Sequence, residues 1–172
     1  MIYYQNNTLI IRPIKLQDAQ AFEQAFRLQN WERKAQLFTD YYYEQSVQLR
    51  YVFVAEYLGK VAGYLTLVPL AQAGPFKDKW PELVDFNVLE AYQEKGIGSH
   101  LMEAAETFAK DLAPVVTLGV GLHVGYGAAQ RLYAKRGYIP DGSGIWYHNQ
   151  PLALNAPCYN DNDLVLYLAK SL

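Results

Sequence analysis

An apolar strand-like run, a glycine turn and a helix-like stretch follow one another from Asp85 to Phe108, and this succession limits the possible folds more than any other feature. The backbone N–H groups at the start of a helix have no intrahelical partner, and the helix dipole is positive there. Glycine, here Gly96 and Gly98, lets such a backbone approach a bound anion closely. The stretch therefore predicts an α/β arrangement in which the turn binds a phosphate group.

The composition is that of one globular domain, which we expect to span residues 1–172. Hydrophobic residues make up 51% of the chain and charged residues 19%, which argues against a disordered protein. The formal net charge of -2 gives no global attraction to nucleic acid or to an anionic membrane, so neither is expected as a partner. Any phosphate site must therefore be local.

Cys158 is the only cysteine, which excludes an intrachain disulfide and a thiolate-rich zinc site. No metal site is predicted. The first residues lack the basic start and long apolar run of a signal peptide, and no apolar run is long enough to cross a bilayer. These observations predict a cytoplasmic protein.

Hydrophobic periodicity predicts helices at residues 18–28, 31–50, 97–112 and 126–136. Strands are expected at residues 8–14, 51–56, 61–68, 81–88, 115–122, 138–147 (with a turn at 140–144) and 164–168. The strands at 81–88 and 115–122 are nearly continuously apolar and flank a helix, so they should form a central parallel pair with a right-handed crossover. The expected fold is one α/β domain, with a mostly antiparallel mixed sheet of about six to seven strands and helices on both faces.

Three kinds of phosphate site compete for the glycine turn. A Walker-type loop needs Lys after its last glycine, whereas Lys95 precedes Gly96 here. A dinucleotide site is a weaker alternative, because Leu101 replaces the third glycine. A second candidate, from Gly119 to Gly125, has its third glycine one place late and is followed by only one more helix. The third reading is the pyrophosphate of an acyl-coenzyme A.

The turn resembles the central acetyl-CoA motif of the GNAT N-acetyltransferase superfamily. In that motif a strand leads into Gln-x-x-Gly-x-Gly and a long amphipathic helix, as Gln93, Gly96 and Gly98 do here. The resemblance implies a GNAT-like fold that uses acetyl-CoA. It also implies that the backbone of the preceding strand pairs with the pantetheine arm, and that the turn holds the pyrophosphate. The cofactor-binding candidates from this region are Phe86, Asn87, Val88, Gln93, Glu94, Lys95, Gly96, Ile97, Gly98, Ser99 and His100.

A second stretch resembles another signature of the same family, in which a Leu-Tyr pair precedes a Gly-aromatic pair. Here Leu132-Tyr133 precedes Gly137-Tyr138, and one buried strand separates the two motifs, as in the family. The resemblance covers essentially the whole chain. It adds Ala129 and Tyr126 to the cofactor-binding candidates, although the family often has Asn where this chain has Tyr126.

The resemblance implies direct transfer of an acetyl group from acetyl-CoA to an amine, with coenzyme A as the product. Tyr133 matches the family's proton donor to the leaving thiolate. The general base stays open between Glu82, Asp85, His123 and a water relay. Glu82 and Asp85 lie an odd number of residues apart, so they should face opposite sides of the sheet unless a bulge intervenes.

The acceptor is the least constrained partner. Aromatic and histidine side chains could form its pocket walls, and the candidates are Tyr42, Tyr43, Trp80, Trp146 and His148. The primary amine of a small molecule or of a peptide fits these walls equally well. We expect a monomer or homodimer. The alternatives are a non-catalytic acyl-CoA sensor or interaction module and, less favoured, a dinucleotide-binding protein.

Overall fold

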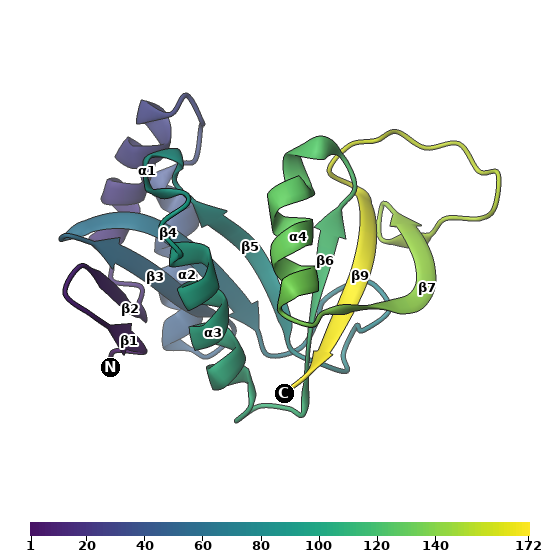
Figure 1. The fold of residues 1–172 in the computed structure, drawn as a ribbon, viewed down its shortest axis with the longest axis horizontal. Coiled ribbons are helices and arrows are strands. Elements are labelled where there is room, and N and C mark those ends of the chain that lie inside the picture. The colour runs from purple at the N-terminus through teal and green to yellow at the C-terminus, as the bar shows by residue number, and fades with distance from the viewer. The chain divides into compact units, whose positions relative to one another are not determined.

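The chain forms a mixed α/β structure in the computed structural model, which describes residues 1–172 (Figure 1). It divides into two compact units. The first unit comprises Met1–Val68 and Val84–Phe108, and the second comprises Pro69–Leu83 and Ala109–Leu172. Strand β5 (Glu82–Val88) begins in the second unit and ends in the first.

The first unit carries the strand order β1-β2-β3-β4-β5. The pairs β1–β2, β2–β3 and β3–β4 are antiparallel. The elements of this unit are β1 (Tyr4–Gln5), β2 (Leu9–Pro13), α1 (Asp18–Leu28), α2 (Ala35–Ser46), β3 (Tyr51–Tyr57), β4 (Lys60–Val68), the 3-10 turn η1 (Glu90–Tyr92) and α3 (Ile97–Ala109), whose last residue is assigned to the second unit.

The second unit carries the order β5-β6-β9-β7-β8. Strands β5 and β6 are parallel, with Glu82 opposite Thr117 and Leu83 opposite Leu118, which confirms the predicted parallel pair. The other pairs in this unit are antiparallel. Its further elements are β6 (Val115–Gly121), the 3-10 turn η2 (Val124–Tyr126), α4 (Gly127–Lys135), β7 (Ile139–Tyr147), β8 (Gln150–Pro151) and β9 (Leu164–Ser171).

The nine strands exceed the predicted six to seven, because β1 and β8 have only two residues each and carry no periodic signal. Helix α2 also starts at Ala35 rather than at residue 31. Asn30 has a left-handed φ of 59°, and the N–H of Trp31 bonds the Phe26 carbonyl at 2.9 Å, which ends α1 and delays the next helix.

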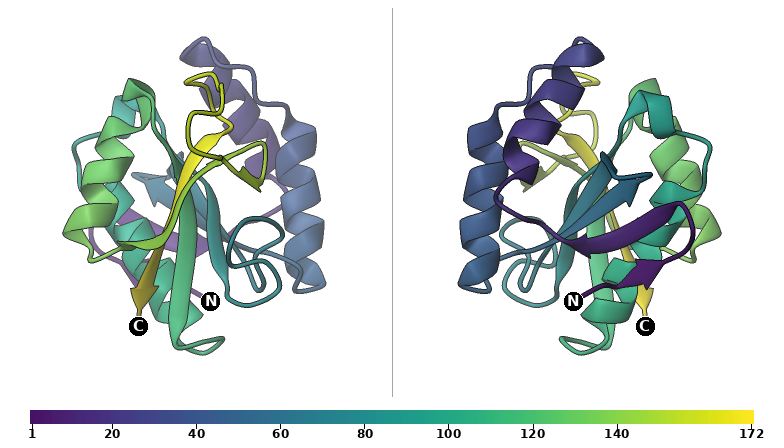
Figure 2. Two further views of the ribbon diagram at one scale, coloured as in Figure 1. Left: turned by 90° about the vertical axis from the view of Figure 1, so that its right-hand side faces the viewer. Right: turned by 90° about the vertical axis from the view of Figure 1, so that its left-hand side faces the viewer.

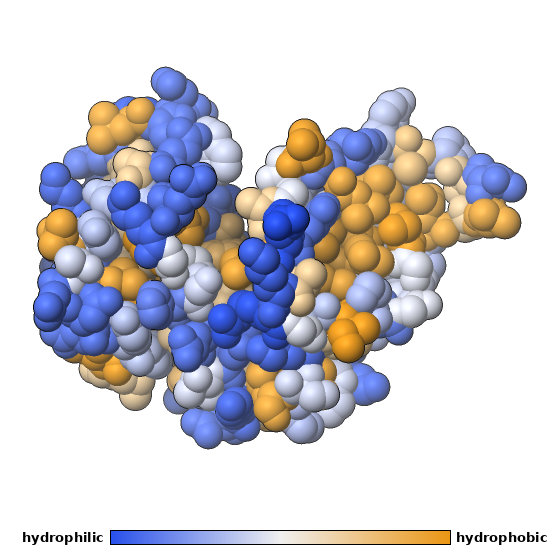
Figure 3. All heavy atoms as spheres, viewed as in Figure 1, coloured by the Kyte–Doolittle hydropathy of each residue, from blue (hydrophilic) through white to orange (hydrophobic).

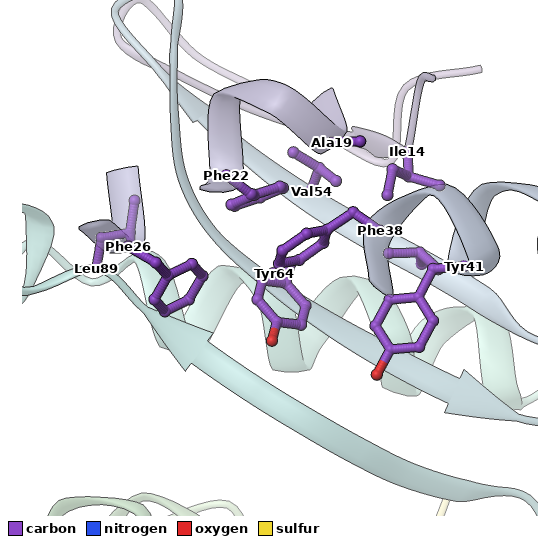
Figure 4. Packing of buried hydrophobic residues seen from close by; sticks show 10 residues of the cluster. Ile14, Ala19, Phe22, Phe26, Phe38, Tyr41, Val54, Tyr64 and Leu89 are labelled. Atoms are coloured by element: carbon purple, nitrogen blue, oxygen red, sulfur yellow. The ribbon is translucent and has the colours of Figure 1, made fainter. Parts of the chain in front are cut away.

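Aromatic residues from α1 and α2 form the core on one face of the first unit's strands (Figure 4). The Phe22 and Phe38 rings lie 4.6 Å apart between centroids, and both meet the Tyr64 ring edge-on. A fully buried side chain of this size contributes roughly 2–3 kcal/mol. The buried members of the cluster are Ile14, Ala19, Phe22, Phe26, Phe38, Tyr41, Val52, Val54, Tyr64 and Leu89.

The opposite face of the same strands is covered by α3. Phe108 on this helix packs against Tyr51, Phe53 and Tyr3, with ring centroids 4.4, 5.8 and 6.1 Å away. Figure 2 shows α1 and α2 on one side of these strands and α3 on the other. The prediction of helices on both faces is confirmed in this unit.

Strand β7 of the second unit is poorly covered along its whole length. None of its nine residues is buried: five are exposed and four are half-buried, and Ile139 keeps 68% of its surface exposed. Figure 3 shows apolar surface on the face of this unit near β7, whereas the visible face of the first unit is mostly hydrophilic. No helix in the structure combines the length and apolar character that crossing a lipid bilayer requires.

Candidate active site

The glycine turn and the start of α3 form the predicted anion cradle in the first unit. Glu94 and Gly96 have left-handed φ values of 61° and 76°, which turn the chain sharply into the helix. The first hydrogen bond inside the turn of α3 runs from the His100 N–H to the Gly96 carbonyl at 3.2 Å. The N–H groups of Ile97 and Gly98 therefore precede the first hydrogen bond of the helix, and they can donate hydrogen bonds to a pyrophosphate.

The cradle is anchored by a buried side chain and a hydrogen bond, and the space around Gly96 is open. The Ile97 side chain is buried, and the Gln93 amide donates to the Val88 carbonyl at 3.1 Å, which ties the turn to the end of β5. A Cβ placed on Gly96 would meet no atom within 4 Å. Glu94 and Lys95 are exposed. The residues present therefore fit a bound phosphate group.

His100 is turned toward the N-terminal hairpin. Its ring stacks on Tyr4 with centroids 4.1 Å apart, and its Nδ1 is buried, without a hydrogen bond, 3.9 Å from the Glu103 carboxylate. Ser99 lies exposed on the first turn of α3. A direct contact of His100 with the cofactor stays a prediction.

Strand residues Phe86, Asn87 and Val88 are half-buried just before the cradle. The Asn87 amide donates to the Asp85 carboxylate at 3.2 Å and to the Tyr64 hydroxyl at 3.3 Å. A Cβ on Gly63 would lie 2.7 Å from the Asn87 carbonyl oxygen, so β4 approaches this segment closely because residue 63 is glycine.

Asp85 is surrounded by hydrogen-bond donors. Its carboxylate accepts from Arg33, Tyr41 and Tyr64, each at 2.8 Å. Its backbone is left-handed, with a φ of 49°. The left-handed residue interrupts the regular alternation of β5, on which the expectation of opposite faces for Glu82 and Asp85 rested.

Glu82 belongs to the second unit and is only 8% exposed. Burial raises the pKa of its carboxyl to about 7. Its charge in turn helps raise the pKa of the neighbouring Tyr167 hydroxyl, after the larger effect of burial. A carboxyl with such a pKa is half ionised near neutral pH, which suits a general base.

Tyr167 is a residue that sequence reasoning missed. In register it lies opposite Gly119, and a Cβ there would lie 3.1 Å from its ring. A Cβ on Gly74 would lie 2.7 Å from its hydroxyl oxygen. Two glycines thus leave room for this ring beside Glu82, and the cross-strand register was the only signal that could have found it.

Tyr133 lies on α4 in the second unit and is 7% exposed. Burial, and secondarily the nearby Tyr126, raise the pKa of its hydroxyl. The phenol therefore stays protonated at neutral pH and is able to donate. Ala129 is half-buried one helical turn earlier.

His123 and Tyr126 meet at Asn162. The His123 Nδ1 accepts the Gly125 N–H at 3.0 Å, and its Nε2 lies 2.9 Å from the Asn162 side-chain oxygen. The Tyr126 hydroxyl donates to the same oxygen at 3.1 Å. Both imidazole nitrogens are engaged, so the geometry favours Glu82 over His123 as a base.

The side chains predicted to line the acceptor pocket lie in different parts of the structure. Trp146 lies against Tyr167, the neighbour of Glu82: the two rings meet edge to face with centroids 5.6 Å apart. His148 pairs with Asp163 at 3.2 Å, and the His148 side chain is 62% exposed. Trp80 is half-buried beside Lys79, whose ammonium lies 5.6 Å from the ring. In the first unit, Tyr42 packs on the aromatic core and Tyr43 is 57% exposed.

The first unit also has an open pocket of ≈ 530 Å³ between the end of α1 and the start of α2. It is lined by Glu23, Arg27, Asn30, Trp31, Glu32, Arg33, Lys34, Ala35 and Gln36. Arg33, which the sequence did not single out, joins this pocket to the Asp85 carboxylate.

Comparison with solved structures shows that the whole fold is shared. The Salmonella typhimurium acetyltransferase that modifies the N-terminal serine of ribosomal protein L7/L12 superposes with a TM-score of 0.73 at 13% identity, covering 100% of this chain and 99% of that one. Ard1 from Thermoplasma volcanium gives 0.69 at 17% identity, with 96% and 98% covered. The Salmonella typhimurium protein yncA, solved with its cofactor acetyl-CoA, gives 0.70 at 16% identity, with 96% and 94% covered.

Comparison by sequence gives the family. Among curated proteins none matches significantly. The model of the acetyltransferase (GNAT) family matches residues 16–138, which is most of the chain and includes both motifs. This match confirms the resemblance and the expected activity and donor. The chain belongs to the acetyltransferase (GNAT) family, whose members use acetyl-CoA as the acyl donor.

Proposed function

We propose that this chain, as a single acetyltransferase domain over residues 1–172, transfers the acetyl group of acetyl-CoA directly to the primary amine of a small molecule or peptide. The observation that carries the mechanism is the buried Glu82 carboxyl, whose pKa of about 7 makes it a proton acceptor at neutral pH. Membership of the acetyltransferase (GNAT) family supports acetyl-CoA as the acyl donor.

Glu82 is the proposed general base. An amine must lose its proton before it can attack a carbonyl, and a carboxylate in a buried site accepts that proton more readily than one in water. The Tyr167 and Trp146 rings in the same unit give an aromatic wall against which the carbon skeleton of the acceptor packs.

Tyr133 is the proposed proton donor to the leaving thiolate. Its raised pKa keeps the hydroxyl protonated, and its burial strengthens a hydrogen bond to a developing anion. When bound, acetyl-CoA supplies an activated thioester. The cradle from Gln93 to Ser99 would hold its pyrophosphate, and the backbone from Phe86 to Val88 would align its pantetheine arm.

The acceptor is proposed to include peptide amines, because a neighbour of the same fold modifies the N-terminal serine of a protein. We propose a cytoplasmic location, supported by Cys158, an exposed thiol without a disulfide partner. The monomer or homodimer expected from the sequence stays a prediction.

The function is tested by measuring release of the coenzyme A thiol from acetyl-CoA against a panel of small amines and short peptides. We expect release with at least one acceptor, and kcat/KM should rise with pH through about 7 as Glu82 ionises. Glu82→Gln should remove this acid limb and lower kcat about 100-fold or more. Binding of acetyl-CoA without thiol release against any amine would instead identify a non-catalytic acyl-CoA module.

Tyr133→Phe tests the proposed acid. The variant keeps the ring and loses only the hydroxyl, so we expect kcat to fall about 100-fold while acetyl-CoA affinity changes little. Tyr138→Phe is a matched control, because Tyr138 is also buried and its ring lies 5.8 Å from that of Tyr133. Unchanged turnover in Tyr133→Phe would contradict the acid role.

A further inference from the structure

The backbone of Asp85 bends β5 at a position where a strand is normally regular. Its φ of 49° lies in the left-handed region, which residues other than glycine seldom adopt. Such conformations persist only where the surrounding structure holds them, and they concentrate at functional sites. The contacts of this side chain show what holds it.

The Asp85 carboxylate collects four donors, three of which come from parts of the first unit that are distant in sequence. Its Oδ2 accepts from Arg33 Nη1, the Tyr41 hydroxyl and the Tyr64 hydroxyl, each at 2.8 Å. Its Oδ1 accepts from the Asn87 amide at 3.2 Å. Arg33 lies just before α2, Tyr41 on α2 and Tyr64 on β4, and Figure 4 shows both hydroxyls pointing out of the aromatic core on the same side.

These donors leave Asp85 little capacity to act as a base. An ionised carboxylate offers about four acceptor sites, and four donors are present. Burial, and then the Asp85 charge, raise the pKa of both the Tyr41 and the Tyr64 hydroxyl, so both remain donors at neutral pH. The carboxylate therefore serves to hold these four neighbouring groups.

The same region of β5 is fixed by further side-chain contacts. The Thr66 hydroxyl donates to the Val84 carbonyl at 2.7 Å, and Arg50 donates to that hydroxyl at 2.8 Å. After the bend, the Asn87 amide bonds the Tyr64 hydroxyl at 3.3 Å. The bend is therefore held both before and after Asp85.

We propose that Asp85 is a positioning residue: its carboxylate joins Arg33, at the pocket between α1 and α2, to the bend of β5. In this way it fixes the backbone from Phe86 to Val88, and it is not the base. The proposal rests on the proposed function, in which this backbone aligns the pantetheine arm. A small displacement of an aligned thioester is enough to slow acyl transfer strongly.

Asp85→Asn removes the charge and keeps the size of the side chain. We expect kcat to fall about 100-fold while the KM for acetyl-CoA changes by less than about threefold. The acid limb of kcat/KM, assigned to Glu82, should keep its midpoint. Loss of that limb in Asp85→Asn, or wild-type kcat, overturns the proposal. Asp111→Asn makes the same change at an exposed position and should behave as the wild type.

Amide hydrogen exchange on the free protein gives a second readout that needs no acetyl-CoA. Asp85→Asn should speed exchange at residues 86–88 and 31–41, whereas Asp111→Asn should not. Unchanged exchange at these residues overturns the proposal. Since this measurement does not depend on activity, a wild-type protein that transfers no acetyl group would contradict only the proposed function.

Tyr41→Phe is the milder variant, for the case in which Asp85→Asn does not fold. It removes one donor and leaves the carboxylate with three. We expect the same pattern, with kcat lowered about two- to fivefold and faster exchange at residues 86–88. Wild-type kcat and exchange in this variant overturn the proposal.

Discussion

A carboxyl that is buried without a cationic partner, as Glu82 is, opposes folding whenever it is ionised. Its pKa rises from 4.5 to about 7 through burial alone. Between these two values the native protein binds a proton that the unfolded chain has already released. Stability must therefore fall as pH rises through this window, and the full penalty applies above it.

Glu82→Gln should for this reason stabilise the protein at alkaline pH. The amide imitates the protonated carboxyl, so the free energy of unfolding at about pH 8 should increase by roughly 3 kcal/mol. The gain should shrink as pH falls and vanish near the unfolded pKa of 4.5. Urea unfolding of both proteins across this range measures it, and a gain that does not depend on pH would contradict the burial argument. The same variant should lose activity, since a group kept at a cost to stability is often a functional one.

Asp85 shows where reasoning from sequence stops at this scale. Alternation along β5 identified two carboxylates near the motif but could not assign their roles. The left-handed φ of Asp85 depends on Arg33, Tyr41 and Tyr64, which are more than twenty residues away in sequence. No local pattern encodes that set of contacts. For Glu82, likewise, the sequence identifies a carboxyl near the motif, and only the structure shows how far this side chain is buried.

At the scale of elements, the cradle depends on the conformation of one glycine. Gly96 has a φ of 76° and open space around its Cβ position, so alanine there strains the backbone without a steric clash. The turn must carry Gln93 to Gly98 into α3 with its N–H groups outward. A shift of this backbone misdirects those groups.

Gly96→Ala should lower the free energy of unfolding by about 1–2 kcal/mol and weaken coenzyme A binding at least about tenfold. Gly59→Ala is the matched control, because Gly59 has a φ of 77°, also open space, and lies in the β3–β4 turn. It should lose similar stability and keep coenzyme A affinity, as measured by calorimetry. Equal affinity in both variants would show that the cradle does not bind the cofactor.

Elements with a strong period were predictable, and short or irregular ones were not. The apolar stripe of α3 and the continuous apolar runs of β5 and β6 predicted the crossover unit, and the stripe of α4 predicted the next helix. Two-residue strands such as β1 are defined only by their partner, here the pairs Tyr4–Ile11 and Gln5–Ile10. Strand β7 was expected to break at its turn, yet Gly142 and Gly144 carry it through as an irregularity against β9.

At the scale of the molecule, each unit contains its own run of neighbouring strands. The first has aromatic residues on one face of its strands and Phe108 on the other. The second has the parallel pair β5–β6 continued by β9 and β7. The cradle belongs to the first unit, whereas Glu82 and Tyr133 belong to the second.

Binding of the donor should stabilise the whole chain, since a ligand that binds only the folded state shifts the unfolding equilibrium by mass action. At about 100 times its dissociation constant, acetyl-CoA should add roughly 2.7 kcal/mol. For a chain of this length that raises Tm by roughly 5–10 °C. NAD at the same concentration should give no shift, because neither glycine stretch completes a dinucleotide fingerprint. Differential scanning fluorimetry measures these shifts in Tm. Gly96→Ala should reduce the shift caused by acetyl-CoA, and Gly59→Ala should not. A Tm shift with NAD and none with acetyl-CoA would contradict the assignment of the cradle to acetyl-CoA.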